Sequence, residues 1–143
     1  MNCTDIIKET IRVFETCLAR ASSSSDRSLL QRHILALNQI MESLDQHGSM
    51  KYQISSFEKL LSDPWMDDRN MFETVYYAWE NFKIAYQAFI GGMTVNERLH
   101  YTGLTAEFEK KKNKLESRTI LREVFISDDD IEKILSSDSA VNS

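Results

Sequence analysis

Residues that break helices are scarce in this chain, and their scarcity constrains the fold more than any other feature. The 143 residues include only four glycines and one proline. Between these breakers, apolar residues recur every three or four positions, which is the period of an amphipathic helix, and no segment alternates with the period of a strand. The sequence therefore predicts an all-α protein, a bundle of about four longer helices followed by several short C-terminal helices.

The first three longer helices are separated by recognisable stop signals. Thr4 is expected to cap the first helix, and the serine-rich segment 21–25 links it to a second helix that opens at Asp26 or Ser28 and stops at Gly48. A third helix is expected over 54–61. It ends at the Asp63-Pro64 step, because the residue before a proline is pushed out of the α region.

The fourth helix is predicted to be the longest and to form the spine of the core. Asp67 or Asp68 should cap it, and it should run to the Gly91-Gly92 pair. Its core stripe is expected to consist of Phe72, Val75, Tyr76, Trp79, Phe82, Tyr86 and Phe89.

Shorter elements follow the glycine pair. Thr94 and Glu97 have the spacing of a capping box, and Gly103 stands where a left-handed C-cap belongs. Further short helices are expected over 106–113, 117–124 and 129–135. We thus expect a bundle core over 1–92 and a short-helix module over 93–135 packed on it within one domain. A frayed tail is expected over 136–143.

The C-terminal module carries a resemblance. Its sequence MTVNERLHYTGLTAEFEKKK, followed by ILREVFISDDDIEKIL, resembles a segment of small, mostly uncharacterised bacterial proteins in which N-E-R-L, G-L and F precede a last helix. The resemblance covers residues 93–135 and includes no catalytic signature. It implies a compact helical module of bacterial origin, and it raises the possibility of a toxin-immunity protein.

Acids and large aromatics are interleaved around the only proline, in the segment SDPWMDDRNMFETVYYAWE over 62–80. Rigid rings supply contact area at the centre of an interface while carboxylates steer the encounter with a basic partner. For Trp65 two readings stay open, an exposed anchor or a cap on the core. Ile84 and Ala88 are expected to pack on another helix. The predicted partner-binding residues are Asp63, Trp65, Asp67, Asp68, Glu73, Tyr77 and Glu80.

Charge is unevenly distributed along the chain, whose net charge is −5. Residues 42–80 hold eight acids against three bases, whereas 107–122 hold six bases against three acids. The acidic part repels phosphates and membrane surfaces, so we expect a protein partner with a basic surface and neither direct nucleic-acid nor membrane binding. The lysines of 110–114 are read as a solvated helix face. With no signal peptide or apolar span, we expect a cytoplasmic protein.

No pattern in the sequence indicates chemistry. Glu97 and His100 have the Glu-x-x-His spacing of di-iron ligands, but one copy without further carboxylates does not build such a site. His33 in a helical bundle suggests phosphoryl transfer, yet the residues that follow it are Ile, Leu and Ala. The three acids 128–130 suit a helix N-terminus. We predict a protein that is not an enzyme and uses no metal or cofactor.

Two functions of different classes remain open. The first is an inhibitory immunity protein that covers the basic cleft of a bacterial toxin, with a nuclease favoured. The second is a regulatory adaptor or secretion chaperone that binds an amphipathic segment in a groove beside the fourth helix. Sequence alone leaves the oligomeric state open.

Overall fold

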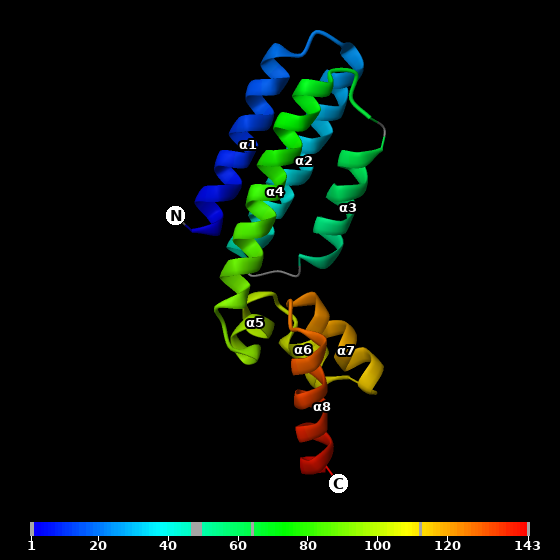
Figure 1. Ribbon diagram of the computed structural model, residues 1–143. Coiled ribbons are helices and arrows are strands. Elements are labelled where there is room, and N and C mark those ends of the chain that lie inside the picture. The colour runs from blue at the N-terminus through cyan, green and yellow to red at the C-terminus, as the bar shows by residue number, and fades with distance from the viewer. Residues whose placement is uncertain (1, 47–49, 64, 112, 143) are drawn as a thin grey trace. The chain divides into compact units, whose positions relative to one another are not determined.

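The computed structural model describes residues 2–46, 50–63, 65–111 and 113–142, for residues 51, 52 and 137–142 by their backbone only. Across these residues the chain forms eight helices and no strand, which confirms the all-α prediction (Figure 1). None of the helices described is long and apolar enough to cross a membrane. The helices are α1 Cys3–Arg20, α2 Ser24–Asp45, α3 Lys51–Ser62, α4 Arg69–Gly91, α5 Val95–Tyr101, α6 Thr105–Glu109, α7 Lys114–Glu123 and α8 Asp128–Asn142.

The chain divides into two compact units. One comprises the residues up to Gln46 together with Met50–Tyr86, and the other contains the chain from Gln87 onward. The division falls inside α4, ahead of the Gly91-Gly92 pair at which we expected the bundle to close. The predicted stops at Gly48 and Pro64 lie outside the described residues.

The first unit packs α1, α2 and α3 against one face of α4. Figure 1 shows α1, α2 and α4 running side by side, with α3 on the far side of α2 from α1. The Thr10 hydroxyl of α1 donates to the carbonyl of Ala78 on α4 at 3.4 Å. The buried residues of α4 in this unit are Val75, Trp79, Phe82 and Tyr86, four members of the predicted core stripe.

Several helices begin earlier than the sequence indicated: α3 and α7 start three residues early, at Lys51 and Lys114, and the caps of α1 and α2 also differ from those expected. Asn2 caps α1 by accepting from the amide of Asp5 at 2.8 Å, where Thr4 was expected. Ser23 caps α2 by accepting from the amide of Asp26 at 3.2 Å, so neither Asp26 nor Ser28 opens that helix. Both Asn2 and Ser23 have a short polar side chain and an extended backbone directly before the helix, which is the geometry that an N-cap requires.

The second unit is built from α5 to α8. Thr94 and Glu97 form the predicted capping box, and Gly103 has the predicted left-handed conformation with φ of 73°. Arg98 fastens this unit by donating to the carbonyls of Gly91, Met93, Val124 and Phe125 at 3.0 to 3.2 Å. Helix α8 continues to Asn142, through the stretch from 136 onward that was expected to be frayed.

Candidate functional site

A buried carboxylate fixes the chain just after Trp65. Asp26, in the first turn of α2, is 2% exposed. Its two carboxylate oxygens accept hydrogen bonds from the backbone amides of Asp67 and Asp68, at 2.7 and 3.0 Å. The start of α2 thereby holds the segment that leads into α4, although the two are separated by 41 and 42 residues in the sequence.

The two acids of that segment have structural work of their own. The Asp68 carboxylate accepts from the amide of Met71 at 3.1 Å and so caps α4, as one of the two predicted caps. The Asp67 carboxylate accepts from the Ser23 hydroxyl at 2.7 Å. Both side chains are exposed, but their removal would disturb the entry to α4 as well as any surface charge.

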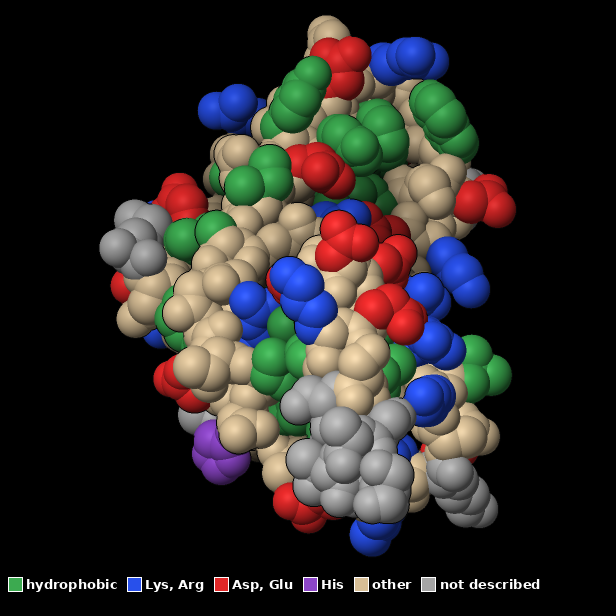
Figure 2. All heavy atoms as spheres, turned by 60° about the horizontal axis from the view of Figure 1, so that its bottom comes forward, with side chains coloured by type: hydrophobic (Ala, Val, Ile, Leu, Met, Phe, Trp, Pro, Cys, Tyr) green, Lys and Arg blue, Asp and Glu red, His purple; other side chains and the backbone are tan. Residues whose placement is uncertain are grey.

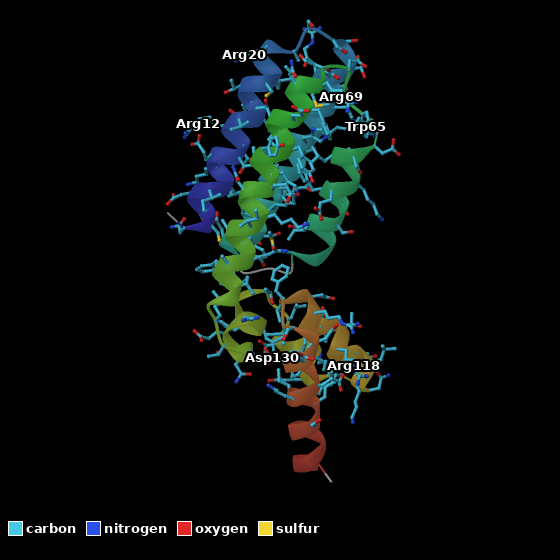
Figure 3. All side chains as sticks on the ribbon, viewed as in Figure 1. Arg12, Arg20, Trp65, Arg69, Arg118 and Asp130 are labelled. Carbon is cyan, nitrogen blue, oxygen red and sulfur yellow. The ribbon has the colours of Figure 1, made fainter. Side chains whose placement is uncertain are left out.

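Trp65 is an exposed ring that is nevertheless held in place. It is 59% exposed, whereas the next residue, Met66, is buried and takes the core position. The Trp65 ring stacks on Phe72 with centroids 5.5 Å apart and planes inclined by 20°. The guanidinium of Arg69 lies 5.4 Å from the ring centroid, and Figure 3 shows the two side chains together where α3 gives way to α4. Trp65 is therefore an ordered side chain at the surface.

The aromatic contacts continue from Trp65 along α4. Phe72 stacks on Tyr76 with centroids 6.0 Å apart, and Tyr76 meets Tyr77 edge to face at 6.1 Å. Phe72 is half-buried and lies at the margin of the predicted core stripe, whereas its members Tyr76 and Phe89 are 42% and 41% exposed, so their assignment to the core is wrong. In Figure 2 hydrophobic side chains likewise stand among acidic ones in the upper part of the view.

The outer face of α4 is apolar as well as acidic. Tyr77 and Ile84 are 65% and 60% exposed, and Glu73 is also exposed. The expectation that Ile84 and Ala88 pack on another helix is wrong, since both side chains are exposed. The reason is rotational: at 100° per residue, Ile84 lies on the side of α4 opposite Val75. We call the following set the α4 surface: Trp65, Arg69, Phe72, Glu73, Tyr76, Tyr77, Glu80 and Ile84.

The structure brings most of the predicted binding residues together. Trp65, Glu73, Tyr77 and Glu80 belong to the α4 surface, with Glu80 half-buried. Asp63 is exposed at the C-terminus of α3. The Asp67 carboxylate is bonded to the Ser23 hydroxyl, and the Asp68 carboxylate caps α4. Sequence reasoning missed Arg69, because its stacking on Trp65 depends on the conformation of the turn before α4, which no local pattern specified.

A charged hydrogen bond borders the α4 surface on the α3 side. The Lys83 ammonium donates to the Glu58 carboxylate at 2.8 Å, and the indole nitrogen of the buried Trp79 donates to the same carboxylate at 3.4 Å. The hydrogen bond with Glu58 raises the pKa of Lys83 above its ordinary value. Glu58 is thus committed to joining α3 and α4.

A groove runs between α1 and the first turns of α4. Its volume is about 440 Å³, and Val13, Cys17 and Met71 contribute to its apolar lining. Arg12 and Arg20 of α1 border it, as Figure 3 shows for their positions along that helix. The Arg12 guanidinium pairs with Glu9 one turn away. This groove lies beside α4, where the adaptor hypothesis requires one.

The residues weighed for chemistry have structural surroundings. His33 is 1% exposed, contacts the rings of Phe14 and Phe57 edge to face, and bonds through Nε2 to the carbonyl of Leu60 at 3.3 Å. Desolvation by burial lowers the pKa of His33. A ring so enclosed is not placed to receive a phosphoryl group from a partner.

The acidic and metal candidates are likewise explained locally. Glu97 accepts from the amide of Thr94 as part of the capping box, while Asp128 pairs with Arg122 at 3.0 Å. The amide of Asp130 donates to the Ser127 hydroxyl at the start of α8. Within the described residues, no group of three or more His, Cys, Asp or Glu side chains is arranged to hold a metal ion.

The basic run lies in the second unit. Lys110 and Lys114 are exposed, and the Lys111 ammonium lies 3.7 Å from the centroid of the Phe108 ring. Lys112 lies outside the described residues. A Glu132 carboxylate one helix away accepts from Arg118 at 2.8 Å, and this bond lowers the pKa of Glu132. Part of the positive charge in this stretch is therefore paired.

Comparison of the chain with protein-family models, with curated proteins and with solved structures finds no match. The site has to be interpreted from its own geometry.

Proposed function

We propose that this chain is a protein-binding inhibitor that docks onto a basic partner through the α4 surface. The observation that supports the proposal best is Trp65, exposed and yet ordered between Phe72 and Arg69. An anchor that is already ordered loses little side-chain entropy on binding, so more of its burial contributes to affinity. Tryptophan, tyrosine and arginine are the residues most enriched among those that dominate interface energies.

The acids around the anchor favour a partner that binds nucleic acid. Asp63 and Glu73 are exposed, and Glu80 is half-buried on the same face of α4 as Glu73. Carboxylates at such positions substitute for the phosphates that a nuclease cleft binds, and they accelerate association with a positive surface. We therefore propose an immunity protein that occludes the cleft of a bacterial toxin nuclease, in agreement with the resemblance of 93–135.

The test begins with capture of the partner from the organism that encodes the chain, by immobilised wild type and by two variants. Trp65→Ala should reduce capture about tenfold or more if the ring is an anchor. Leu35→Ala is the matched control, because Leu35 is 63% exposed on α2, away from the α4 surface. Equal capture by wild type and by folded Trp65→Ala would refute the docking surface.

The inhibitory role needs a second measurement on the purified partner. The partner alone should cleave RNA or DNA, and the chain should abolish this activity at a one-to-one ratio, with Trp65→Ala inhibiting only at higher concentration. A partner that cleaves neither nucleic acid, or one that remains active when saturated with the chain, would exclude the immunity role and leave a binding protein.

The groove between α1 and α4 supports a second candidate, a regulatory adaptor or secretion chaperone. Its apolar floor and charged border suit an amphipathic segment of another protein. Thr74→Tyr would place a ring in this groove, since Thr74 is one of its lining residues. An adaptor that uses the groove should lose its partner in Thr74→Tyr and retain it in Trp65→Ala, whereas the inhibitor should show the opposite pattern.

A further inference from the structure

The outer face of α4 carries a regular pattern. Glu73 and Glu80 are seven residues apart, and so are Tyr77 and Ile84. Seven residues make about two helical turns, so each pair forms a line along the helix about 10 Å long. The acidic line and the apolar line are neighbours on the side of α4 that faces away from its buried residues.

This pattern matches the seam between two helices. Two helices that pack at a shallow angle contact each other through residues spaced by about seven positions. Tyr77 and Ile84 supply the apolar positions of such a seam, and both are more than half exposed. Glu73 and Glu80 supply the flanking charges that select a partner by its sign. Within the first unit, α1, α2 and α3 occupy the other side of α4.

We infer that the α4 surface binds a basic amphipathic helix of another protein, laid along α4 over Tyr77 and Ile84 with its Lys or Arg side chains against Glu73 and Glu80. This inference rests on the proposed function and specifies the partner segment for the same surface. A second copy of this chain does not meet the requirement, because two such faces would bring four glutamates together.

A synthetic peptide of three heptads tests the inference. It carries Leu at the first and Lys at the fourth position of each heptad, with Ala and Gln elsewhere. A second peptide has Glu in place of Lys, and a third has Leu and Lys exchanged in the middle heptad. We expect the first peptide to gain helicity on binding and to shift backbone amide NMR signals of 73–84. The other two should bind about tenfold more weakly or not at all.

Variants of α4 provide the controls. Tyr77→Ala and Ile84→Ala should each weaken peptide binding several-fold to tenfold, while Leu35→Ala leaves it unchanged. The double variant Glu73→Gln, Glu80→Gln should also remove most of the salt dependence of binding. Each of these side chains is at least partly exposed, and the thermal unfolding of each variant is measured to show that it is folded.

Several outcomes would overturn the inference. One is that the peptide with Glu in place of Lys, or the peptide with Leu and Lys exchanged, binds as tightly as the first peptide. Another is that Tyr77→Ala and Ile84→Ala bind the first peptide as wild type does. A third is that the NMR shifts centre on Arg12 and Thr16, in the groove between α1 and α4. Concentration-dependent shifts on α4 without peptide would instead indicate self-association. If no peptide binds but a native partner is lost with Trp65→Ala, the proposed function stands and the helical partner is wrong.

Discussion

Removal of the Asp26 carboxylate should destabilise the first unit more than removal of any exposed acid. Asp26 is 2% exposed, and both of its oxygens accept from backbone amides, at 2.7 and 3.0 Å. In Asp26→Ala those amides, which belong to Asp67 and Asp68, lose their acceptor at the entry to α4. Asp26→Asn keeps one oxygen but turns an NH₂ group toward the other amide.

The size of the effect follows from the two hydrogen bonds. A hydrogen bond to a charged group contributes roughly 1.5–3 kcal/mol to stability, and leaving a buried donor without a partner costs about 1–3 kcal/mol. Water that enters the space recovers part of this, so we expect Asp26→Ala to lower the free energy of unfolding by roughly 2–4 kcal/mol. For a chain of this size that corresponds to a fall in Tm of roughly 5–15 °C.

The assay is thermal and urea unfolding followed by circular dichroism, with Asp45→Ala as the matched control. Asp45 ends the same helix, is exposed, and lies where a negative charge opposes the helix dipole. We expect Asp45→Ala to leave Tm unchanged or slightly raised. If Asp26→Ala lowers the free energy of unfolding by less than about 0.5 kcal/mol, which is the range of ordinary surface substitutions, the stabilising role of Asp26 is refuted.

Three further predictions concern buried or bridging groups. Burial lowers the pKa of His33, so just below pH 6.5 its imidazole is protonated in the unfolded chain but not in the folded one. As the pH falls through this range, wild type should lose up to about 1.4 kcal/mol of stability per pH unit relative to His33→Gln. A stability difference that does not depend on pH would contradict this prediction. Cys3 and Cys17 are buried free thiols, and burial raises their pKa values. Both should react with a thiol reagent far more slowly in the native protein than in the urea-unfolded protein. Equal reaction rates would place the two thiols at the surface. Arg98→Met should remove the four hydrogen bonds to carbonyls and destabilise the second unit by roughly 2–4 kcal/mol, which is measured as faster hydrogen exchange over 95–126. Arg98→Lys should be nearly as destabilising, because an ammonium cannot reach all four acceptors. Unchanged exchange would exclude this role of Arg98.

The features that were predicted from sequence are those with local causes. The Asp68 cap, the Thr94–Glu97 box and the left-handed Gly103 each depend on residues within a few positions of one another. Phe125 shows the limit of such reasoning. It has φ of 63° at the end of α7, a conformation in which glycine is expected, and the Arg98 guanidinium donates to its carbonyl.

The two hydrogen bonds that Asp26 accepts could not be predicted, because their donors lie 41 and 42 residues away in the sequence. We expected the helix to open at Asp26 or Ser28, whereas Ser23 caps it and Asp26 lies in its first turn. The local pattern gives no sign that the carboxylate turns away from its own helix to bind the amides of Asp67 and Asp68. Its burial, and hence its weight in stability, arises only when α2 and the start of α4 come together.

The same distinction explains how the exposed face of α4 was partly predicted. Helix α4 carries apolar residues around most of its circumference, and periodicity alone does not decide which of them the bundle covers. Packing buries Val75, Trp79 and Phe82 and leaves Tyr77 and Ile84 exposed. The informative signal was that Glu73 and Glu80 are interleaved with Tyr77 and Ile84. An acid is seldom buried without a partner, so these glutamates indicate an exposed face. The proposed docking of an external partner therefore rests on an apolar stripe that is flanked by charge on the outside of the bundle.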